Sequence, residues 1–450
     1  MVSDPAQAHT SEGGFVLLLP TDFYIASGVF AVALTVAFMA FLPSSAAVRI
    51  FTPLRLWRSR PNGLPRATSL VSAAVLMWLV YVGLNGSRDP LANPLPLTIW
   101  TVWWVGLVFV QGFVVDLWRW INPWTGPVWV LQSLMGRQSQ FRLSPKIGHS
   151  LGVVSFLGFV AFLLADIAPS DPARLARAVA AYWLLHLIGN LLFGHRWALR
   201  AEGIGMVMQL YARLAPFGRS AQGRAFGFWG WQTVRRRVVS PGLALLCLLV
   251  LGSGSFDGVN ETFWWLAQLG LNPLEFPGRS AVIWQTLVGL MASNVLLVAI
   301  FAATLWLGLR LGRVTHVSLA TAFCLFAPTV LPIALGYHFA HYFTSFLVEA
   351  QYVRIALTDP WSRGQDFLGL GQIYVTTGFF NTQDSVRVLW LCQAGGVVIG
   401  HIVAVLLAHA VAVRHFGSAR TALLSQVPLA IFMICYTFFG LWLLASPRGF

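Results

Sequence analysis

The sequence predicts an all-α polytopic membrane protein with about ten transmembrane helices. Charged residues make up 10% of the chain and apolar residues 57%, whereas about a quarter of the residues in a soluble domain are charged. Long apolar stretches recur along the whole chain, and the loops between them alternate between arginine-rich and arginine-poor. Together these observations favour a helical bundle whose main solvent is lipid.

Each apolar stretch is long enough to form a transmembrane helix, because about 20 helical residues cross roughly 30 Å of hydrocarbon. Ten such stretches can be placed, at 20–43, 67–85, 97–117, 149–168, 177–195, 238–256, 280–308, 316–350, 386–412 and 421–445. No soluble domain or low-complexity linker interrupts them. We therefore expect a single transmembrane domain over residues 1–450.

The basic residues predict an orientation. Lys and Arg total 29, and 21 of them fall in the odd-numbered loops. Cytoplasmic loops carry the excess of Lys and Arg, so we expect these loops in the cytoplasm and both termini outside. The protein is then a multi-pass protein of the cell membrane, most simply of a bacterial inner membrane, in contact with the lipid bilayer. The net charge of +14 is scattered over loops, which argues against a nucleic-acid partner.

The connection 201–237 separates two groups of five spans, 1–200 and 238–450. Its helically spaced apolar residues, with arginine and aromatic neighbours, predict either a helix in the cytoplasmic membrane interface or a loop packed under the bundle. Five spans per half would make the second half an inverted repeat of the first. The segments 122–126 and 359–364 share an Asx-Pro-Trp start. They are either equivalent parts of such a repeat or independent turns, since Asx-Pro initiates turns by itself.

The eighth stretch, 316–350, predicts a broken helix. As one straight helix it would be about 50 Å long, well beyond the hydrocarbon thickness. Pro328 and Pro332 remove backbone donors and Gly336 loosens the turn, so we expect a departure from regular helix between Ala327 and Gly336. Carbonyl groups freed by the break need partners from the protein or from a water-filled cavity.

Four polar residues continue along one face of the same helix. His338, His341, Ser345 and Glu349 recur at helical spacing. Lipid cannot face such a stripe without a large desolvation cost, so the stripe should face the protein interior or water. Partner groups are expected at similar depth on other spans, at His186, Asn190 and His401.

The ninth stretch carries a surface of small residues. Gly396 and Gly400 are four residues apart and therefore lie on one helix face. Small residues at this spacing allow another helix to approach closely within a membrane. We expect a neighbouring helix to pack here, directly beside His401.

Three functional hypotheses are compatible with these residues. The first is a transporter or permease-like protein that couples protonation to alternating access, with a small solute or ion bound by His338, His341, Glu349, His186 and Asn190. The second is a membrane subunit of a respiratory or electron-transfer assembly, with haem b or a transition metal on His338, His341, His401 and His186. The third is a structural subunit that binds other membrane proteins. Walker, dinucleotide and di-iron patterns are absent from the sequence, so we do not predict an enzyme.

The predicted orientation can be tested by cysteine labelling. Single cysteines introduced within 219–232 into a cysteine-free variant should react with an impermeant reagent only from the cytoplasmic side, because this loop is rich in arginine. Cysteines within 358–372 should react only from outside. Labelling of both segments from one side would contradict the orientation.

Overall fold

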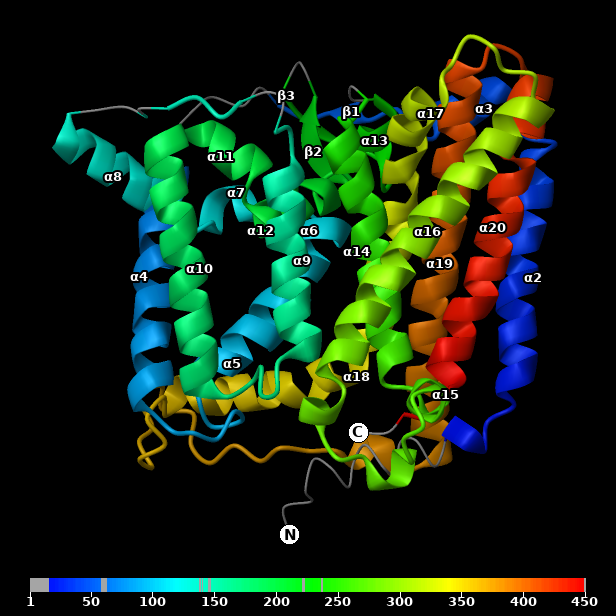
Figure 1. Cartoon of the computed structure of the whole chain (residues 1–450). Helices are drawn as coiled ribbons and strands as arrows, with labels where there is room; N and C mark the ends of the chain where they lie inside the picture. Colours follow the sequence, from blue (N-terminus) through cyan, green and yellow to red (C-terminus); the bar gives the residue numbers. More distant parts are fainter. Residues whose placement is uncertain are drawn as a thin grey trace.

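The computed structural model describes residues 16–57, 63–136, 139, 141–144, 147–220, 223–235 and 238–448 (Figure 1). This part of the chain contains nine helical segments long and apolar enough to cross a membrane. They are α2 (Thr21–Met39), α4 (Leu64–Asn85), α5–η1–α6 (Pro94–Phe113), α10 (Pro172–Phe193), α14 (Pro241–Asn260), α16 (Ile283–Leu311), α17–η4–α18 (Leu319–Thr358), α19 (Gln383–His415) and α20 (Ala419–Ala445). The fourth predicted span is the shorter helix α9 (Ser150–Ala165). The chain therefore has the architecture of a multi-pass helical membrane protein.

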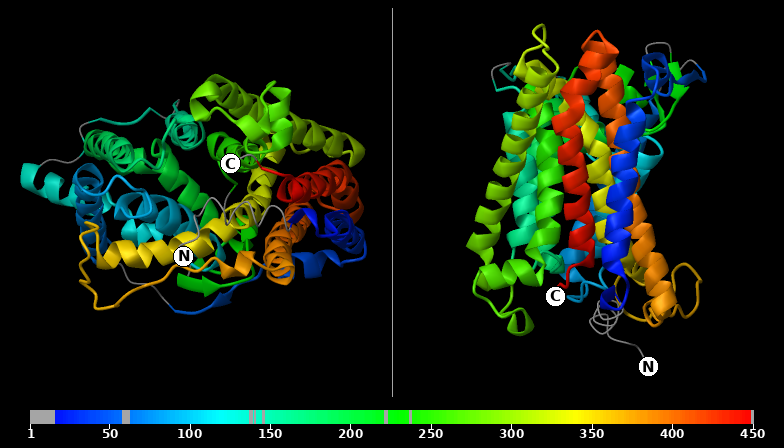
Figure 2. Two further views of the ribbon diagram at one scale, coloured as in Figure 1. Left: turned by 90° about the horizontal axis from the view of Figure 1, so that it is seen from below. Right: turned by 90° about the vertical axis from the view of Figure 1, so that its right-hand side faces the viewer.

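Two groups of long helices stand side by side in Figure 1. One contains α4, α9 and α10, and the other contains α14, α16, α19 and α20. Helix α2 packs against α19 and α20 of the second group, although it comes first in the sequence (Figure 2). Short helices connect the long ones: α3 (Ser44–Arg49), α7 (Trp118–Ile121), α8 (Thr125–Met135), α11 (His195–Arg200), α13 (Trp231–Arg235), α15 (Phe263–Gln268), η2 (Pro273–Glu275), η3 (Arg279–Ala281) and η5 (Gly378–Phe380).

The third span is not a regular α-helix. It begins at α5 (Pro94–Pro96), continues as the π-helix η1 (Leu97–Leu107) and ends as α6 (Val108–Phe113). The buried Asn93 starts this segment, where its side-chain oxygen accepts a hydrogen bond from the backbone N–H of Leu95 at 3.0 Å. Such π-helical segments are rare and are frequently found at functional sites. The sequence contained no signal for this one.

The predicted break in the eighth span is confirmed. Helix α17 (Leu319–Phe326) ends in the 3₁₀ turn η4 (Ala327–Val330), and α18 (Leu331–Thr358) follows. Pro328 lies in this turn, and Pro332 lies in the first turn of α18. Backbone N–H groups in the first turn of a helix have no acceptor within the helix, so proline costs no hydrogen bond there. The irregular part is shorter than predicted, because Gly336 already lies within regular helix. Beyond the break, α18 runs obliquely and lies beside η1, along the edge of the first helix group (Figure 2, left).

A small sheet modifies the all-α prediction. Strands β1 (Leu54–Arg55), β2 (Phe217–Ser220) and β3 (Gly223–Phe226) form an antiparallel sheet in the order β1-β3-β2. In its register Leu54 lies opposite Phe226, and Gly218 lies opposite Ala225. The sheet joins the first arginine-rich loop to the third, and it covers one end of the bundle (Figure 1).

The middle connection does not place its helix in lipid. Helix α12 (Gly203–Tyr211) is almost entirely buried inside the protein. A side chain at Gly203 would come within 2.4 Å of the backbone nitrogen of Phe156, so only glycine allows α12 to lie this close to α9. Of the two alternatives for 201–237, the burial of α12 therefore favours a segment packed against the bundle.

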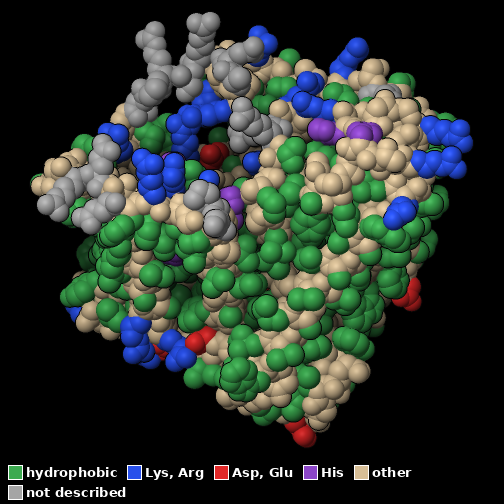
Figure 3. Space-filling model, turned by 45° about the horizontal axis from the view of Figure 1, so that its top comes forward, with side chains coloured by type: hydrophobic (Ala, Val, Ile, Leu, Met, Phe, Trp, Pro, Cys, Tyr) green, Lys and Arg blue, Asp and Glu red, His purple; other side chains and the backbone are tan. Residues whose placement is uncertain are grey.

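Basic residues gather at the end of the molecule that carries the sheet (Figure 3). Helix α2 begins and α20 ends at the opposite end (Figure 1). In each of the two Asx-Pro-Trp segments the Asx side chain accepts hydrogen bonds from residues that follow it, although at different spacings. Asn122 accepts hydrogen bonds from the backbone N–H and the hydroxyl group of Thr125. The Asp359 carboxylate accepts from the backbone N–H groups of Arg363 and Gly364. The inverted repeat itself stays a prediction.

The predicted small-residue surface on α19 is confirmed as a helix contact. A side chain at Gly400 would come within 2.6 Å of the Pro332 carbonyl oxygen, and one at Gly336 within 2.5 Å of the Gly396 carbonyl oxygen. The backbones of α18 and α19 therefore touch. Close backbone contact of this kind stabilises helix pairs in lipid, where burial of apolar surface contributes little.

We predict that Gly400→Ala destabilises the protein by about 1–3 kcal/mol, because the added methyl group forces α18 and α19 apart. Gly395→Ala is a matched control on the same helix, since nothing lies within 4 Å of a side chain there. The measurement is thermal unfolding in detergent. Equal unfolding temperatures for the two variants would contradict the close contact.

Candidate functional site

The polar stripe of α18 faces the protein interior, and its residues contact two different neighbours. The imidazole Nε2 of His338 donates a hydrogen bond to the Trp104 carbonyl oxygen at 2.8 Å, since a carbonyl can only accept. The His338 ring also lies edge-on to Trp104, with centroids 5.1 Å apart, and near Phe109. His338 therefore joins α18 to the π-helix η1.

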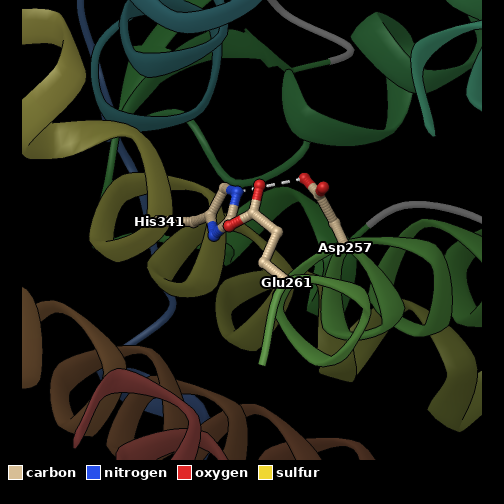
Figure 4. A group of neighbouring side chains, drawn as sticks. All are labelled: Asp257, Glu261 and His341. Atoms are coloured by element: carbon tan, nitrogen blue, oxygen red, sulfur yellow. Dashed lines mark ion pairs between the residues drawn. The ribbon is translucent and has the colours of Figure 1, made fainter. Parts of the chain in front are cut away.

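His341 faces α14 and belongs to a charged cluster (Figure 4). Its Nε2 lies 3.2 Å from a carboxylate oxygen of Asp257, and both side chains are largely buried. The Tyr342 hydroxyl donates to the same carboxylate oxygen at 2.7 Å. Glu261 completes the group, and one ligand atom each from Asp257, Glu261 and His341 lie within 4.8 Å of one another.

The local sequence explains how the two carboxylates meet the histidine. Asp257 and Glu261 are four residues apart at the end of α14, so they share one helix face. Thr262 then starts α15 as its N-cap and also forms a β-bridge with Arg448. This bridge brings the Arg448 guanidinium to 3.6 Å from the Glu261 carboxylate. The C-terminal segment therefore closes the cluster on one side.

Glu349 lies outside this cluster. Its carboxylate accepts a short hydrogen bond from the Thr101 hydroxyl group on η1. His338 and Glu349 thus attach α18 to η1 at two points, three turns of helix apart, while His341 attaches it to α14. The stripe predicted as one site is divided between a contact with the π-helix and an ionisable cluster.

His186 and Asn190 lie in a separate network on α10. The Trp197 indole N–H donates to His186 Nδ1 at 3.0 Å, so the proton of a neutral ring is on Nε2. That Nε2 lies 3.3 Å from the Ser155 hydroxyl oxygen and donates to it. His186 therefore cannot act as the base that activates Ser155. Asn190 donates to the backbone carbonyl of His186 on its own helix at 2.7 Å.

The His186 network continues to a buried glutamate. The Ser155 hydroxyl lies 3.2 Å from the Tyr182 hydroxyl, which donates to Glu202 at 2.6 Å. Glu202 caps α12 by accepting from the backbone N–H groups of Ile204 and Gly205 at 3.0 and 2.6 Å. Burial raises the pKa of Glu202 to about 7, although these three donors favour its charged form.

His401 lies directly beside the contact between α18 and α19, fully buried. Its Nδ1 donates to the Val397 carbonyl oxygen at 2.9 Å on the same helix, and Nε2 has no partner among the described residues. Its ring is 6.3 Å from that of Tyr436. Within the described part of the chain, no hydrogen bond, ion pair or ring contact joins His401 or His186 to the two histidines of α18.

The two carboxylates beside His341 were not predicted from the sequence. The predicted sixth span ends at residue 256, whereas α14 continues to Asn260 and includes Asp257. A signal for them was present in the sequence, because both acidic residues lie close to the end of a long apolar stretch. A helix often continues beyond the point where its hydropathy falls, so such residues can belong to the helix. Asp257 and Glu261 were instead assigned to a loop.

This cluster could hold a small cation better than the histidines could hold haem. One imidazole and two carboxylates are ligands that suit transition metals such as manganese, iron or zinc. Arg448 beside Glu261 opposes such an ion by its charge. Haem b would need one imidazole from each of two facing helices, and His338 Nε2 is already bonded to Trp104.

Comparisons with known proteins give no independent indication of function. Searches of protein-family models, curated proteins and solved structures find no match for this chain. The geometry described above is therefore the basis for any functional assignment.

The raised pKa of Glu202 predicts a pH-dependent stability. The protonated Glu202 carboxyl contributes to the free energy of unfolding. This contribution is fully present below the pKa of about 4.5 in the unfolded chain and is lost as the pH rises towards the folded pKa of about 7, because the folded protein favours the protonated form. The unfolding temperature of the wild type should therefore fall over this pH range relative to that of Glu202→Gln, which cannot ionise. Glu275→Gln, at an exposed position, is the matched control. A difference between wild type and Glu202→Gln that stays constant with pH would contradict this assignment.

Proposed function

We propose that this protein is a membrane transporter of the permease type, in which the cluster of His341, Asp257 and Glu261 takes up and releases a proton to drive solute movement. The observation that carries the proposal is the convergence of three ionisable side chains from two long apolar helices. Ionisable groups inside transmembrane segments are costly and typically belong to ion or substrate pathways.

Protonation of this cluster would change the contact between two helices. The His341 imidazole and the Asp257 carboxylate attract each other only while the first is charged and the second is ionised. Loss of either charge leaves its partner buried without an opposite charge, which is unfavourable in a low dielectric. The proton therefore biases α18 towards or away from α14.

The break between α17 and α18 allows such a movement. The 3₁₀ turn at Ala327–Val330 separates the two helices, so α18 can tilt without α17. Because His338 and Glu349 attach α18 to η1, a tilt also pulls on the π-helix. A π-helix is rare and is frequently found at functional sites, and its i→i+5 hydrogen bonds make it a suitable place for a change of helical register.

The distribution of charge supports a cytoplasmic location for the sheet-bearing end. The arginine-rich loops lie there, so the ionisable cluster lies towards the outer side of the cell membrane. An inverted repeat of five plus five spans would suit alternating access, and the two capped Asx-Pro-Trp turns are its support. The lipid bilayer and a small solute are the partners that this function implies.

A metal-binding membrane subunit is the second candidate. The nitrogen and two carboxylate groups of the cluster favour it, since together they could ligate a divalent cation. In that case the cluster would bind a metal ion, as a cofactor or as the transported species, instead of a proton. Metal analysis separates this candidate from the proton-coupled transporter.

The transport proposal can be tested in cells that express the protein at matched membrane levels. A defined mixture of organic solutes is supplied under an inward proton gradient, and uptake is measured by mass spectrometry. Wild-type protein should accumulate at least one solute, and a protonophore should abolish the accumulation. Asp257→Asn and His341→Ala should each lower it by about ten-fold or more, because each removes one member of a buried charged pair.

His316→Ala is the matched control, because this exposed histidine precedes the same broken helix but lies outside the cluster. It should retain wild-type uptake. An uptake profile equal to that of cells without the protein would contradict the proposal. Stoichiometric metal that is lost in Asp257→Asn, or a haem absorption band in the purified protein, would also overturn it.

A further inference from the structure

A second site lies at the arginine-rich end of the molecule. A cavity of about 710 Å³ lies between α4, α7, α8, α11, α12 and the β2–β3 hairpin. Figure 3 shows the corresponding hollow, with basic side chains around it and acidic side chains inside. Binding pockets for organic molecules have volumes of about 300–1,000 Å³. This cavity therefore has room for much more than an inorganic ion.

The cavity lining has an excess of positive charge. Two acidic residues, Asp116 and Glu202, face five arginines, which are Arg66, Arg119, Arg213, Arg219 and Arg224. The Asp116 carboxylate accepts a hydrogen bond from Gln111 at 2.9 Å. In the part of the chain that the structure describes, no ion pair joins Arg66, Arg119, Arg219 or Arg224 to a carboxylate. The positive charge of these four residues is thus left for a bound anion to neutralise.

Arg119 is the arginine whose surroundings most require an anion. Its Nη1 is buried and has no hydrogen-bond partner among the described residues. Burial lowers the pKa of Arg119, and the nearby Arg224 guanidinium lowers it further. Two guanidinium groups at close range in a partly dry cavity repel each other. A phosphate or carboxylate between them would satisfy both groups with charge-assisted hydrogen bonds.

Rigid aromatic side chains form another wall of the cavity. Trp118, Trp124 and Trp129 line it, and the rings of Trp118 and Trp124 lie edge to face, 6.1 Å apart. The Trp124 indole N–H donates to the Trp183 carbonyl oxygen at 3.0 Å, which fixes its ring. Ordered aromatic rings favour ligands that carry an apolar or flat body.

We infer that this cavity binds an organic anion whose phosphate or carboxylate group contacts Arg119 and Arg224 and whose apolar body packs on Trp118 and Trp124. Binding by itself does not depend on the proposed function. The further assignment of this anion as the transported solute rests on that function. A soluble metabolite and a lipid headgroup could both supply the anionic group.

The test is calorimetric titration of the full-length protein in phosphatidylcholine nanodiscs with 1-naphthyl phosphate, which combines a phosphate with an aromatic body. We expect saturable binding that weakens as salt is added. Arg119→Gln and Arg224→Gln should each weaken it by about ten-fold or more, because each removes a charge-assisted hydrogen bond. Arg310→Gln is the matched control, since Arg310 also lies over a tryptophan ring but is not part of the lining.

The outcomes distinguish this inference from the transport proposal. His341→Ala should bind the probe normally, because the ionisable cluster is a separate site, so a failure of coupled transport leaves the binding result intact. Loss of probe binding in nanodiscs that contain phosphatidylglycerol would assign the site to a lipid headgroup, and unchanged binding would assign it to a soluble anion. Equal affinity for the neutral 1-naphthol, or equal affinity in wild type, Arg119→Gln and Arg224→Gln, would overturn the inference. Unfolding temperatures of the variants show whether they are folded.

Discussion

The close contact between α18 and α19 determines where the ionisable groups of this protein lie. Gly336, Gly396 and Gly400 bring the two backbones together without intervening side chains. Because α18 is held on this side by α19, its polar stripe must face η1 and α14. The contacts of His338 and Glu349 with η1, and of His341 with α14, follow from this placement. Small residues thus position the charged ones, as expected where lipid supplies no hydrophobic force between helices.

A continuous series of aromatic contacts connects the two proposed sites. Trp118 in the cavity lining is 6.0 Å from Trp103, and Trp103 is 6.0 Å from Trp104. The Trp104 ring contacts His338 at 5.1 Å, and His338 contacts Tyr342 at 4.8 Å. The Tyr342 hydroxyl then donates a hydrogen bond to the Asp257 carboxylate.

Most members of this series belong to η1 or to α18. A change in the angle of α18 would therefore alter the same layer that separates the cavity from the cluster. In the proposed transporter, this layer is the barrier that must open for a solute to pass. The π-helix that carries Trp103 and Trp104 is the part of the barrier where a shift of helical register would have the greatest effect.

The sequence was informative where a residue type restricts the backbone directly. Pro328 predicted the break in the eighth span, and Gly396 with Gly400 predicted the helix contact. The π-helix was unpredictable because its tryptophans fit an ordinary helix equally well. Helix α12 was ambiguous, since a helix of nine mostly apolar residues suits a membrane surface or a protein core. Asp257 was missed because apolar composition locates helix centres better than helix ends.

The two sites also complement each other electrostatically. The proposed anion cavity has an excess of arginine, whereas the proposed proton site has two carboxylates beside one imidazole and one guanidinium. An anion and a proton that cross together carry less net charge through the low-dielectric layer than either does alone. In the proposed transporter, an organic anion that moves with a proton would use both sites at a lower electrostatic cost than the anion by itself. His338 lies between the two sites, and its imidazole donates a hydrogen bond to the Trp104 carbonyl oxygen. In the proposed transporter, this bond couples a movement of α18 to η1 without requiring a charge on His338.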